Sequence, residues 1–314
     1  MRVCRYQHQG QTHRGFYSED GVVSITAAAK AYSQATGKDV AISESDSLLP
    51  LLPCGTDFEA ANQLAAWVDA NRGKLPSGTV LALNDVKLLV PVATPNKIFL
   101  LAGNYAEHIR EGGGVAAERL ETFPYVFLKP ITTLTNPGDP IRIPEVSPDH
   151  IDWELELGVV IGKEAKGVSE ADALKYVAGY TVVNDVSDRR YRPNPDRKVR
   201  RNDAFFDWLH GKWHDTFCPM GPCIASSDTI EPEKLPMKLT VNGEVKQDAN
   251  TGQQIFPVAA VIEFISRSVT LQPGDIISTG TPAGVGNTTG TYLKAGDKVE
   301  ATIGSIGTLS NPVK

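Results

Sequence analysis

Acidic residues occupy positions 152, 154 and 156 at the start of the segment DWELELGVVIG, residues 152–162, and apolar residues lie between them. Such alternation predicts a β-strand, so Glu154 and Glu156 point to the same side, about 6.5–7 Å apart. A third carboxylate, Asp185, follows the apolar run of the next predicted strand, residues 180–188. For the two glutamates alone, a plain solvated face explains the pattern as well as a site does. Three carboxylates among apolar strands need a cation, and all-oxygen ligation favours Mg²⁺ or Mn²⁺.

An acid–base pair is the second chemical feature. His108 and Glu111 stand three residues apart, which places them on one face of a short helical turn. The glutamate would orient the imidazole and raise its basicity, so that the histidine could take a proton from water. Three glycines, 112–114, would let this segment close over a bound substrate. From the spacing alone, an incidental pair at an exposed helix start is the more common explanation.

Six short motifs occur in order between about residues 97 and 299. They are GNYAEH, KP, ExE, NDVSxR, GKWHDTFCPMGP and PGDIISTGTPAGVG. Each is weak alone, but the ordered set covers most of the chain. It resembles the fumarylacetoacetate hydrolase family, in particular its shorter acylpyruvate hydrolase and isomerase-decarboxylase branch.

The resemblance implies a role for each matching residue. Glu154, Glu156 and Asp185 would hold Mg²⁺ (or Mn²⁺), which would chelate the carboxylate and 2-oxo group of a keto acid. His108, oriented by Glu111, would activate the hydrolytic water, and Lys212 with Lys129 would stabilise developing negative charge. The substrate-binding positions are Tyr105, Lys129, Arg189, Gly280 and Thr281.

The activity expected on this basis is hydrolysis of a carbon–carbon bond in an acylpyruvate. Fumarylpyruvate or maleylpyruvate would yield pyruvate and a carboxylic acid, in aromatic or sugar-acid catabolism. The same chemistry serves an oxaloacetate-type decarboxylase or a 2-hydroxyhepta-2,4-diene-1,7-dioate isomerase, so these alternatives stay open. A binding protein without catalysis is a further alternative, against which the intact His108, Glu111 and Lys212 argue.

The segment after Asp185 departs from the family pattern. The usual NDVSARD reads NDVSDRR here, so Asp188 replaces alanine, and a basic loop follows at residues 189–203. The loop is either a solvated or subunit-contacting segment or a source of arginines that reach a substrate carboxylate. Downstream, His210 and His214 match no functional position and are expected to be structural.

Many short predicted strands, few helices and one strand–helix–strand unit position these residues. They predict an α+β, mainly β fold: a mixed β-sandwich roll with a small N-terminal α+β module. We expect the module at 1–92, with two β-strands and two helices, and a catalytic domain at 93–314. Within that domain we expect a helix at 168–179 ended by Gly179, an irregular segment at 205–222, an Asn242-Gly243 hairpin and a helix near 256–268.

Composition narrows the class further. The 314 residues carry a formal net charge of −6 and are 41% hydrophobic, which argues against nucleic-acid or membrane partners and allows a large core. The four cysteines are expected to be reduced core residues of a cytoplasmic protein. A homodimer is expected from the resemblance alone.

Overall fold

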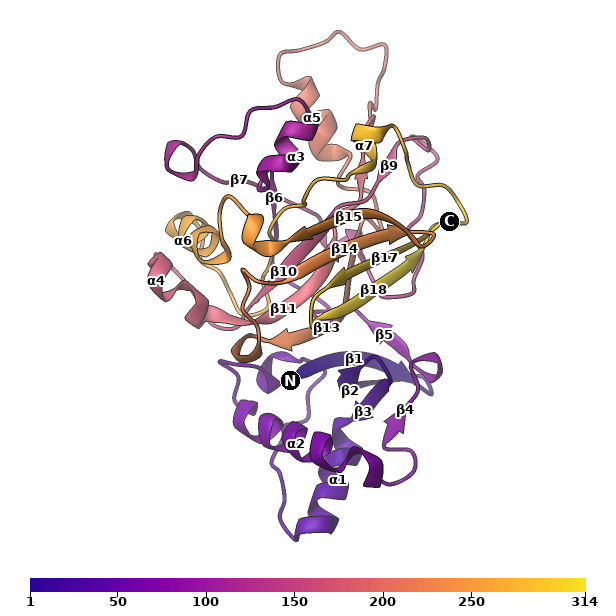
Figure 1. Cartoon of the computed structure of the whole chain (residues 1–314), viewed down its shortest axis with the longest axis vertical. Helices are drawn as coiled ribbons and strands as arrows, with labels where there is room; N and C mark the ends of the chain where they lie inside the picture. The colour runs from indigo at the N-terminus through magenta and orange to yellow at the C-terminus, as the bar shows by residue number, and fades with distance from the viewer.

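The computed structural model describes residues 1–314, which build a β-rich molecule in three sheets (Figure 1). The largest sheet has 12 strands, a second has four and a third has two. The fold is therefore the mainly β, α+β architecture that the sequence predicts. None of its helices is both long and apolar enough to pass through a lipid bilayer.

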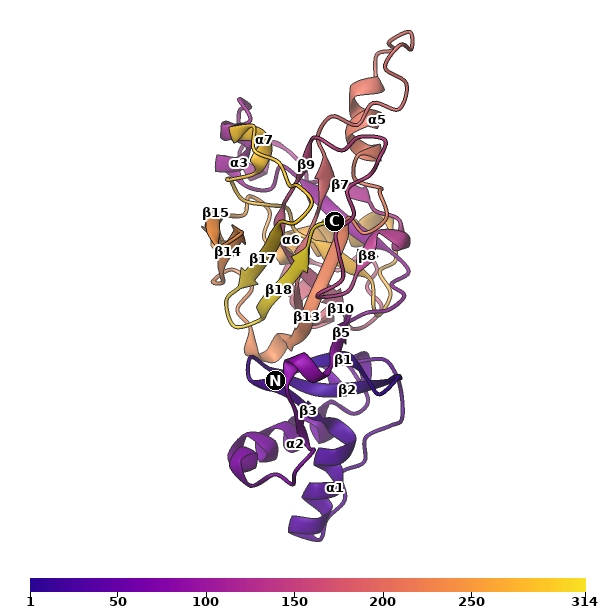
Figure 2. The same ribbon diagram turned by 90° about the vertical axis from the view of Figure 1, so that its right-hand side faces the viewer.

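The N-terminal module is a small curled sheet with two helices against one face (Figures 1 and 2). Its elements are β1 (Arg2–His8), β2 (Gln11–Ser18), β3 (Gly21–Ser24), α1 (Ile25–Thr36), α2 (Phe58–Asn71), β4 (Val80–Leu81) and β5 (Lys87–Leu89). Ser24 caps α1 through Ala27 N–H, and Gly37 ends it with φ 70°. Both predicted helices are present, while the predicted pair of strands is resolved as three antiparallel strands.

The central sheet runs through the whole molecule. From the module it continues as β1, β13 (Cys218–Ser226), β11 (Val177–Asn184), β10 (Leu155–Ile161), β16 (Ile276–Ser278), β6 (Ile98–Ala102) and β7 (Tyr125–Leu128). The short strand β8 (Leu134–Thr135) pairs with β13. Strands β10 and β11 are buried along their whole length, because other layers cover both of their faces.

The four-stranded sheet covers one face of this central sheet. It has the order β15 (Glu244–Asn250), β14 (Pro236–Val241), β17 (Lys298–Ile303) and β18 (Gly307–Pro312). Leu155, Leu157, Val159 and Ile161 lie in the core between the two sheets. The predicted hairpin is present, with positive φ at both Asn242 (53°) and Gly243 (82°), as a tight two-residue turn requires. Helix α6 (Val258–Ser268) flanks the sheets.

The end of the molecule opposite the N-terminal module carries short elements and loops (Figures 1 and 2). These are α3 (Ala106–Glu111), β9 (Ile151–Asp152), β12 (Ser187–Asp188), α5 (Asp203–His210) and α7 (Gly286–Thr289). Strands β9 and β12 pair to form the two-stranded sheet.

Two predictions about local structure are wrong. The helix at 168–179 is only α4 (Glu170–Ala173) followed by a 3-10 turn, and β11 already begins at Val177. Gly179 lies inside β11, where a Cβ would meet the Ala225 carbonyl oxygen of β13 at 2.3 Å, so this glycine permits the close pairing of the two strands rather than ending a helix. The segment 205–222 is not irregular: it holds most of α5 and the first half of β13.

Candidate active site

Three buried carboxylates converge near the ends of β10 and β11. Each of Glu154, Glu156 and Asp185 offers an oxygen, and these oxygens all lie within 4.8 Å of one another. The predicted strand at 152–162 is interrupted around Glu154, whose N–H donates to Oδ1 of Asn184 at 2.9 Å. Asp185 N–H donates to the Glu154 carbonyl at 2.9 Å, which fixes the two strand ends together.

Three cationic side chains neutralise part of this charge. Nζ of Lys212 lies 2.6 Å from both Oε2 of Glu154 and Oδ2 of Asp185. Nζ of Lys129 pairs with the other Asp185 oxygen and donates to the carbonyls of Val186 and Phe217. All three N–H bonds of Lys129 are thus used within the protein. Its predicted role at the substrate stays a prediction.

Arg189 links Glu154 to a fourth buried carboxylate, Asp152. Its Nε donates to Oδ2 of Asp152 at 2.7 Å and its terminal nitrogen to Oε1 of Glu154 at 2.5 Å. Burial opposes ionisation of Glu154, yet Lys212 and Arg189 together hold the pKa of this carboxyl below its usual value. The predicted contact of Arg189 with substrate stays a prediction, because here the guanidinium serves two protein carboxylates.

Glu156 is the carboxylate without a cationic partner. Its Oε2 accepts hydrogen bonds from Ser278 Oγ at 2.6 Å and from Gly280 N–H at 2.9 Å. Burial, followed by repulsion from Asp185 and Glu154, raises the pKa of Glu156 well above its usual value. A bound cation would counter both the burial and the repulsion, so this carboxylate is suited to ligating one.

The donor set fits a divalent metal ion. Four carboxylates face three cations at this site, which leaves one negative charge when all four carboxylates are ionised. Each carboxylate oxygen has two lone pairs, so oxygens that already accept one hydrogen bond retain a second lone pair. Buried, all-oxygen and net negative, the cluster suits a hard cation such as Mg²⁺ or Mn²⁺ and would become net positive on binding it.

The histidine–glutamate pair is formed as predicted. Nδ1 of His108 lies 2.8 Å from Oε1 of Glu111, and both side chains are 20% exposed. The second oxygen of Glu111 accepts the N–H of Gly284 at 2.9 Å. Gly284 has φ 100°, and a Cβ there would meet the Lys246 carbonyl oxygen at 2.1 Å, so glycine is required. A positive charge on His108 would lower the pKa of Glu154, so the dyad lies near the carboxylate cluster.

The remaining predicted substrate residues have partners within the protein. Thr281 Oγ1 accepts a hydrogen bond from Gln247 at 2.8 Å, and Gly280 donates to Glu156 as described. The Tyr105 hydroxyl contacts Met237 Sδ at 3.1 Å, and this tyrosine is 2% exposed. Their roles toward substrate stay predictions.

Three supporting residues escaped the sequence analysis. Asp152 accepts N–H groups of Gly286 and Asn287 as well as Arg189. Asn184 orients Glu154, and Gln247 accepts Leu155 N–H at 2.9 Å while donating to Thr281 and the Pro282 carbonyl. Asn184 lies beside Asp185 in NDVS and could have been suspected. Gln247 lies 92 residues after Leu155, and no local pattern marks it.

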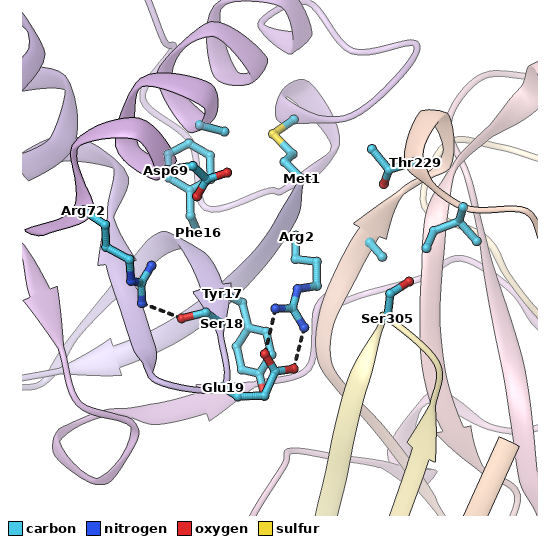
Figure 3. A pocket seen from close by; sticks show the side chains of 13 residues that line it. Met1, Arg2, Phe16, Tyr17, Ser18, Glu19, Asp69, Arg72, Thr229 and Ser305 are labelled. Carbon is cyan, nitrogen blue, oxygen red and sulfur yellow. Dashed lines mark hydrogen bonds and ion pairs between the residues drawn. The ribbon is translucent and has the colours of Figure 1, made fainter. Parts of the chain in front are cut away.

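A separate cavity of about 490 Å³ lies where the N-terminal module meets the rest of the chain (Figure 3). Arg2 is paired with Glu19 there, and Arg72 donates to Ser18 (Figure 3). None of the carboxylates described above lines this cavity.

Comparisons with known proteins identify the family of the chain. The family model for the C-terminal region of fumarylacetoacetate (FAA) hydrolase matches residues 97–314. The chain is 41% identical to oxaloacetate tautomerase fahd2, mitochondrial, from Xenopus laevis over 273 residues, which are 84% of this chain and 80% of that protein. It is 40% identical to oxaloacetate tautomerase YisK from Bacillus subtilis (strain 168) over 272 residues, which are 85% of this chain and 86% of that protein. The crystal structure of maleylpyruvate hydrolase from Sphingobium sp. SYK-6 in complex with manganese(II) ion and pyruvate matches this structure with a TM-score of 0.70 and 30% sequence identity. The match covers 100% of this chain and 98% of that one.

Proposed function

The chain belongs to the fumarylacetoacetate hydrolase family, and on that premise we propose that it interconverts the keto and enol forms of oxaloacetate or a similar 2-oxo dicarboxylate. Two relatives that are oxaloacetate tautomerases match over more than four fifths of the chain, which supports this substrate class. Divalent-metal dependence follows from the family and the carboxylate cluster. The choice of Mg²⁺, with Mn²⁺ as the alternative, is part of the proposal.

The observation that carries the proposal is the free nitrogen of an oriented histidine. Glu111 holds Nδ1 of His108, while Nε2 forms no hydrogen bond within the protein. Gly284 N–H in turn holds Glu111, so the carboxylate that orients the imidazole is itself fixed in place. A histidine held this way can take a proton from the carbon next to a 2-oxo group and return it.

Positive charge at the site would stabilise the enolate through which the keto and enol forms interconvert, in either direction. A divalent ion bound by Glu154, Glu156 and Asp185 would act as a Lewis acid on the carboxylate and 2-oxo groups of the substrate. Lys212, buried beside Glu154 and Asp185, adds positive charge next to the position where negative charge grows. His108 accepts the carbon-bound proton through Nε2, and the proton returns to carbon or passes to oxygen.

Hydrolysis of an acylpyruvate is the second candidate. It is favoured by the same dyad, because an imidazole that can take a proton from carbon can also take one from water. The maleylpyruvate hydrolase among the solved structures supports this reading, but at lower identity than the tautomerases. Decarboxylation of oxaloacetate and isomerisation of a dienoate would use the same residues.

The test supplies the substrates in parallel to protein with added Mg²⁺, with added Mn²⁺ and with chelator. Oxaloacetate, fumarylpyruvate, maleylpyruvate and acetylpyruvate are offered, and products are identified. Chelator-sensitive decay of enol-oxaloacetate without loss of carbon supports the proposal. Pyruvate plus a carboxylic acid supports the hydrolase, and pyruvate plus carbon dioxide supports the decarboxylase.

Two variants test whether the His108–Glu111 dyad takes part in turnover. H108A should lower turnover by about 100-fold or more while leaving Mn²⁺ affinity unchanged in calorimetry. E107Q, whose side chain is 71% exposed next to His108, is the matched control and should keep wild-type turnover. Equal turnover of H108A and wild type would remove His108 from the mechanism.

A further inference from the structure

A buried aspartate–histidine pair, Asp188 and His214, lies next to the chain segment that carries Lys212. Nε2 of His214 is 3.5 Å from Oδ2 of Asp188, and neither atom has a hydrogen-bond partner. The Asp188 side chain is fully buried, and that of His214 is 16% exposed. Buried polar atoms without partners are rare in folded proteins, so two that face each other are expected to serve each other.

Asp188 attaches the lysine-bearing segment to the strand that follows Asp185. It ends β12, three residues after Asp185, and its N–H donates to the carbonyl of Gly211 at 2.9 Å. Gly211 precedes Lys212, whose ammonium group spans Glu154 and Asp185. A Cβ at Gly211 would meet the Asp188 carbonyl oxygen at 2.4 Å, so the two backbones are in close contact.

His214 holds the other end of the same segment. Its carbonyl accepts the N–H of Phe217 at 3.2 Å, and the Phe217 carbonyl accepts from Lys129 at 2.6 Å. The imidazole lies between two rings, with centroids 4.9 Å from Tyr191 and 5.0 Å from Phe217. These rings restrict the imidazole to the side of Asp188.

We propose that Asp188 and His214 are positioning residues that hold residues 211–217 in place, and with them the ammonium group of Lys212 between Glu154 and Asp185. His214 donates through Nε2–H, and Asp188 accepts through Oδ2. The role of Lys212 in turnover rests on the proposed function, whereas its placement does not.

The test separates position from stability with four variants: D188A, H214F, D188A/H214F and H214Q. Lys212 is 2% exposed, so its acylation by an amine-reactive ester, mapped by mass spectrometry, reports on its placement without any substrate. Each single apolar variant leaves one buried polar group unpaired and should lose stability in urea. Both should also show Lys212 acylated at least about tenfold faster and kcat lowered by about tenfold or more, with KM changing less.

The double variant and the glutamine variant decide the question. D188A/H214F removes both polar groups, so its stability should return toward wild type while Lys212 stays reactive and kcat stays low. In H214Q the amide nitrogen can donate to Asp188 as Nε2 does, so protection of Lys212 and kcat should be largely rescued. The matched control is H210Q at the end of α5, next to this segment, because the His210 ring packs on Trp213 and forms no ion pair with a carboxylate; it should behave as wild type.

Recovery of Lys212 protection and kcat together with stability in D188A/H214F would overturn the proposal, because the pair would then only fill space. Unchanged acylation of Lys212 in every variant would overturn it as well. A wild-type protein that turns over no offered substrate would refute the proposed function alone, since the acylation and stability measurements still decide the positioning role.

Discussion

Glu156 is the carboxylate of the cluster that has no cationic partner within the protein, and this gives a prediction about both metal binding and stability. E156Q keeps an acceptor for Ser278 and Gly280 but removes a buried charge. We expect Mn²⁺ affinity to fall at least about 100-fold in calorimetry, because a ligand is lost. In chelator, we expect the melting temperature to rise by roughly 2–6 °C, since an uncompensated buried charge costs about 1–3 kcal/mol.

The pH dependence of that gain follows from the raised pKa. A carboxyl whose pKa is higher in the folded than in the unfolded protein makes the folded state less stable as the pH rises above the ordinary value of 4.5. The advantage of E156Q over wild type in chelator should therefore be larger at about pH 8 than at about pH 5. A metal-free E156Q protein less stable than wild type at both values would contradict this account of Glu156.

Arg189 supplies a second prediction, because its two contacts distinguish positioning from substrate binding. Nε and a terminal nitrogen serve different carboxylates, Asp152 and Glu154, and a lysine can reach only one of them. R189K keeps the charge, yet we expect Mn²⁺ affinity to fall about 10–100-fold. The measurement is calorimetry beside steady-state kinetics. A raised KM with unchanged metal affinity would instead support the contact with a substrate carboxylate.

The two glutamates of the cluster and Gln247 show which parts of the site the sequence can predict. The alternation around Glu154 and Glu156 correctly placed both carboxylates on the side opposite the apolar core, because that pattern is local. Gln247 was missed, since its contacts with Leu155 and Thr281 depend on how β15 lies over β10. A side chain that supports a site from a distant strand leaves no spacing to recognise.

At the scale of elements, the secondary structure was predicted wrongly where pairing with a neighbouring strand overrides the local preference for a helix. Residues 168–179 have helix-forming composition and a glycine at the expected end, yet β11 takes the last three because it must pair with β10 and β13. Conversely, α1 and the 242–243 turn were predicted correctly, since a cap or a turn is encoded by adjacent residues.

The glycine-rich loop after β16 gives a prediction that belongs to this scale. In G284A the new Cβ would press on the Lys246 carbonyl, so the loop must shift and its N–H would leave Glu111. We expect kcat to fall roughly 100-fold through misorientation of His108. G290A is the matched control: its φ is 68° and nothing lies near its Cβ position, so it should cost only about 1 kcal/mol in urea and spare kcat. Equal kcat losses in both variants would contradict the role of Gly284.

The whole molecule raises the question of whether the predicted boundary at residue 92 separates independent units. β1 pairs with β13 through Arg2 and Val3, so the central sheet continues from the module into the rest of the chain. We expect residues 93–314 alone to aggregate, because removing β1 would expose an edge of β13. The check is size-exclusion chromatography of the truncated chain with and without added residues 1–92. A monodisperse, folded fragment would show that the boundary at 92 separates autonomous domains.

The other open edge of the sheet bears on assembly. Strand β7 ends the central sheet, and beside it four aromatic side chains are between 46% and 63% exposed: Phe123, Tyr125, Phe205 and Phe206. An apolar cavity of about 540 Å³ lies among Phe123, Tyr125, Phe205 and Trp208. Exposed aromatic surface of this extent beside a sheet edge is typical of a protein interface, so we propose that the expected homodimer forms here. F205D should then lower the sedimentation coefficient toward that of a monomer, whereas V80D, at a 37% exposed position in β4 at the opposite end of the sheet, should not. A wild-type protein that sediments as a monomer at high concentration would exclude the dimer. If F205D sediments as a dimer like the wild type, the interface does not lie at these aromatic residues.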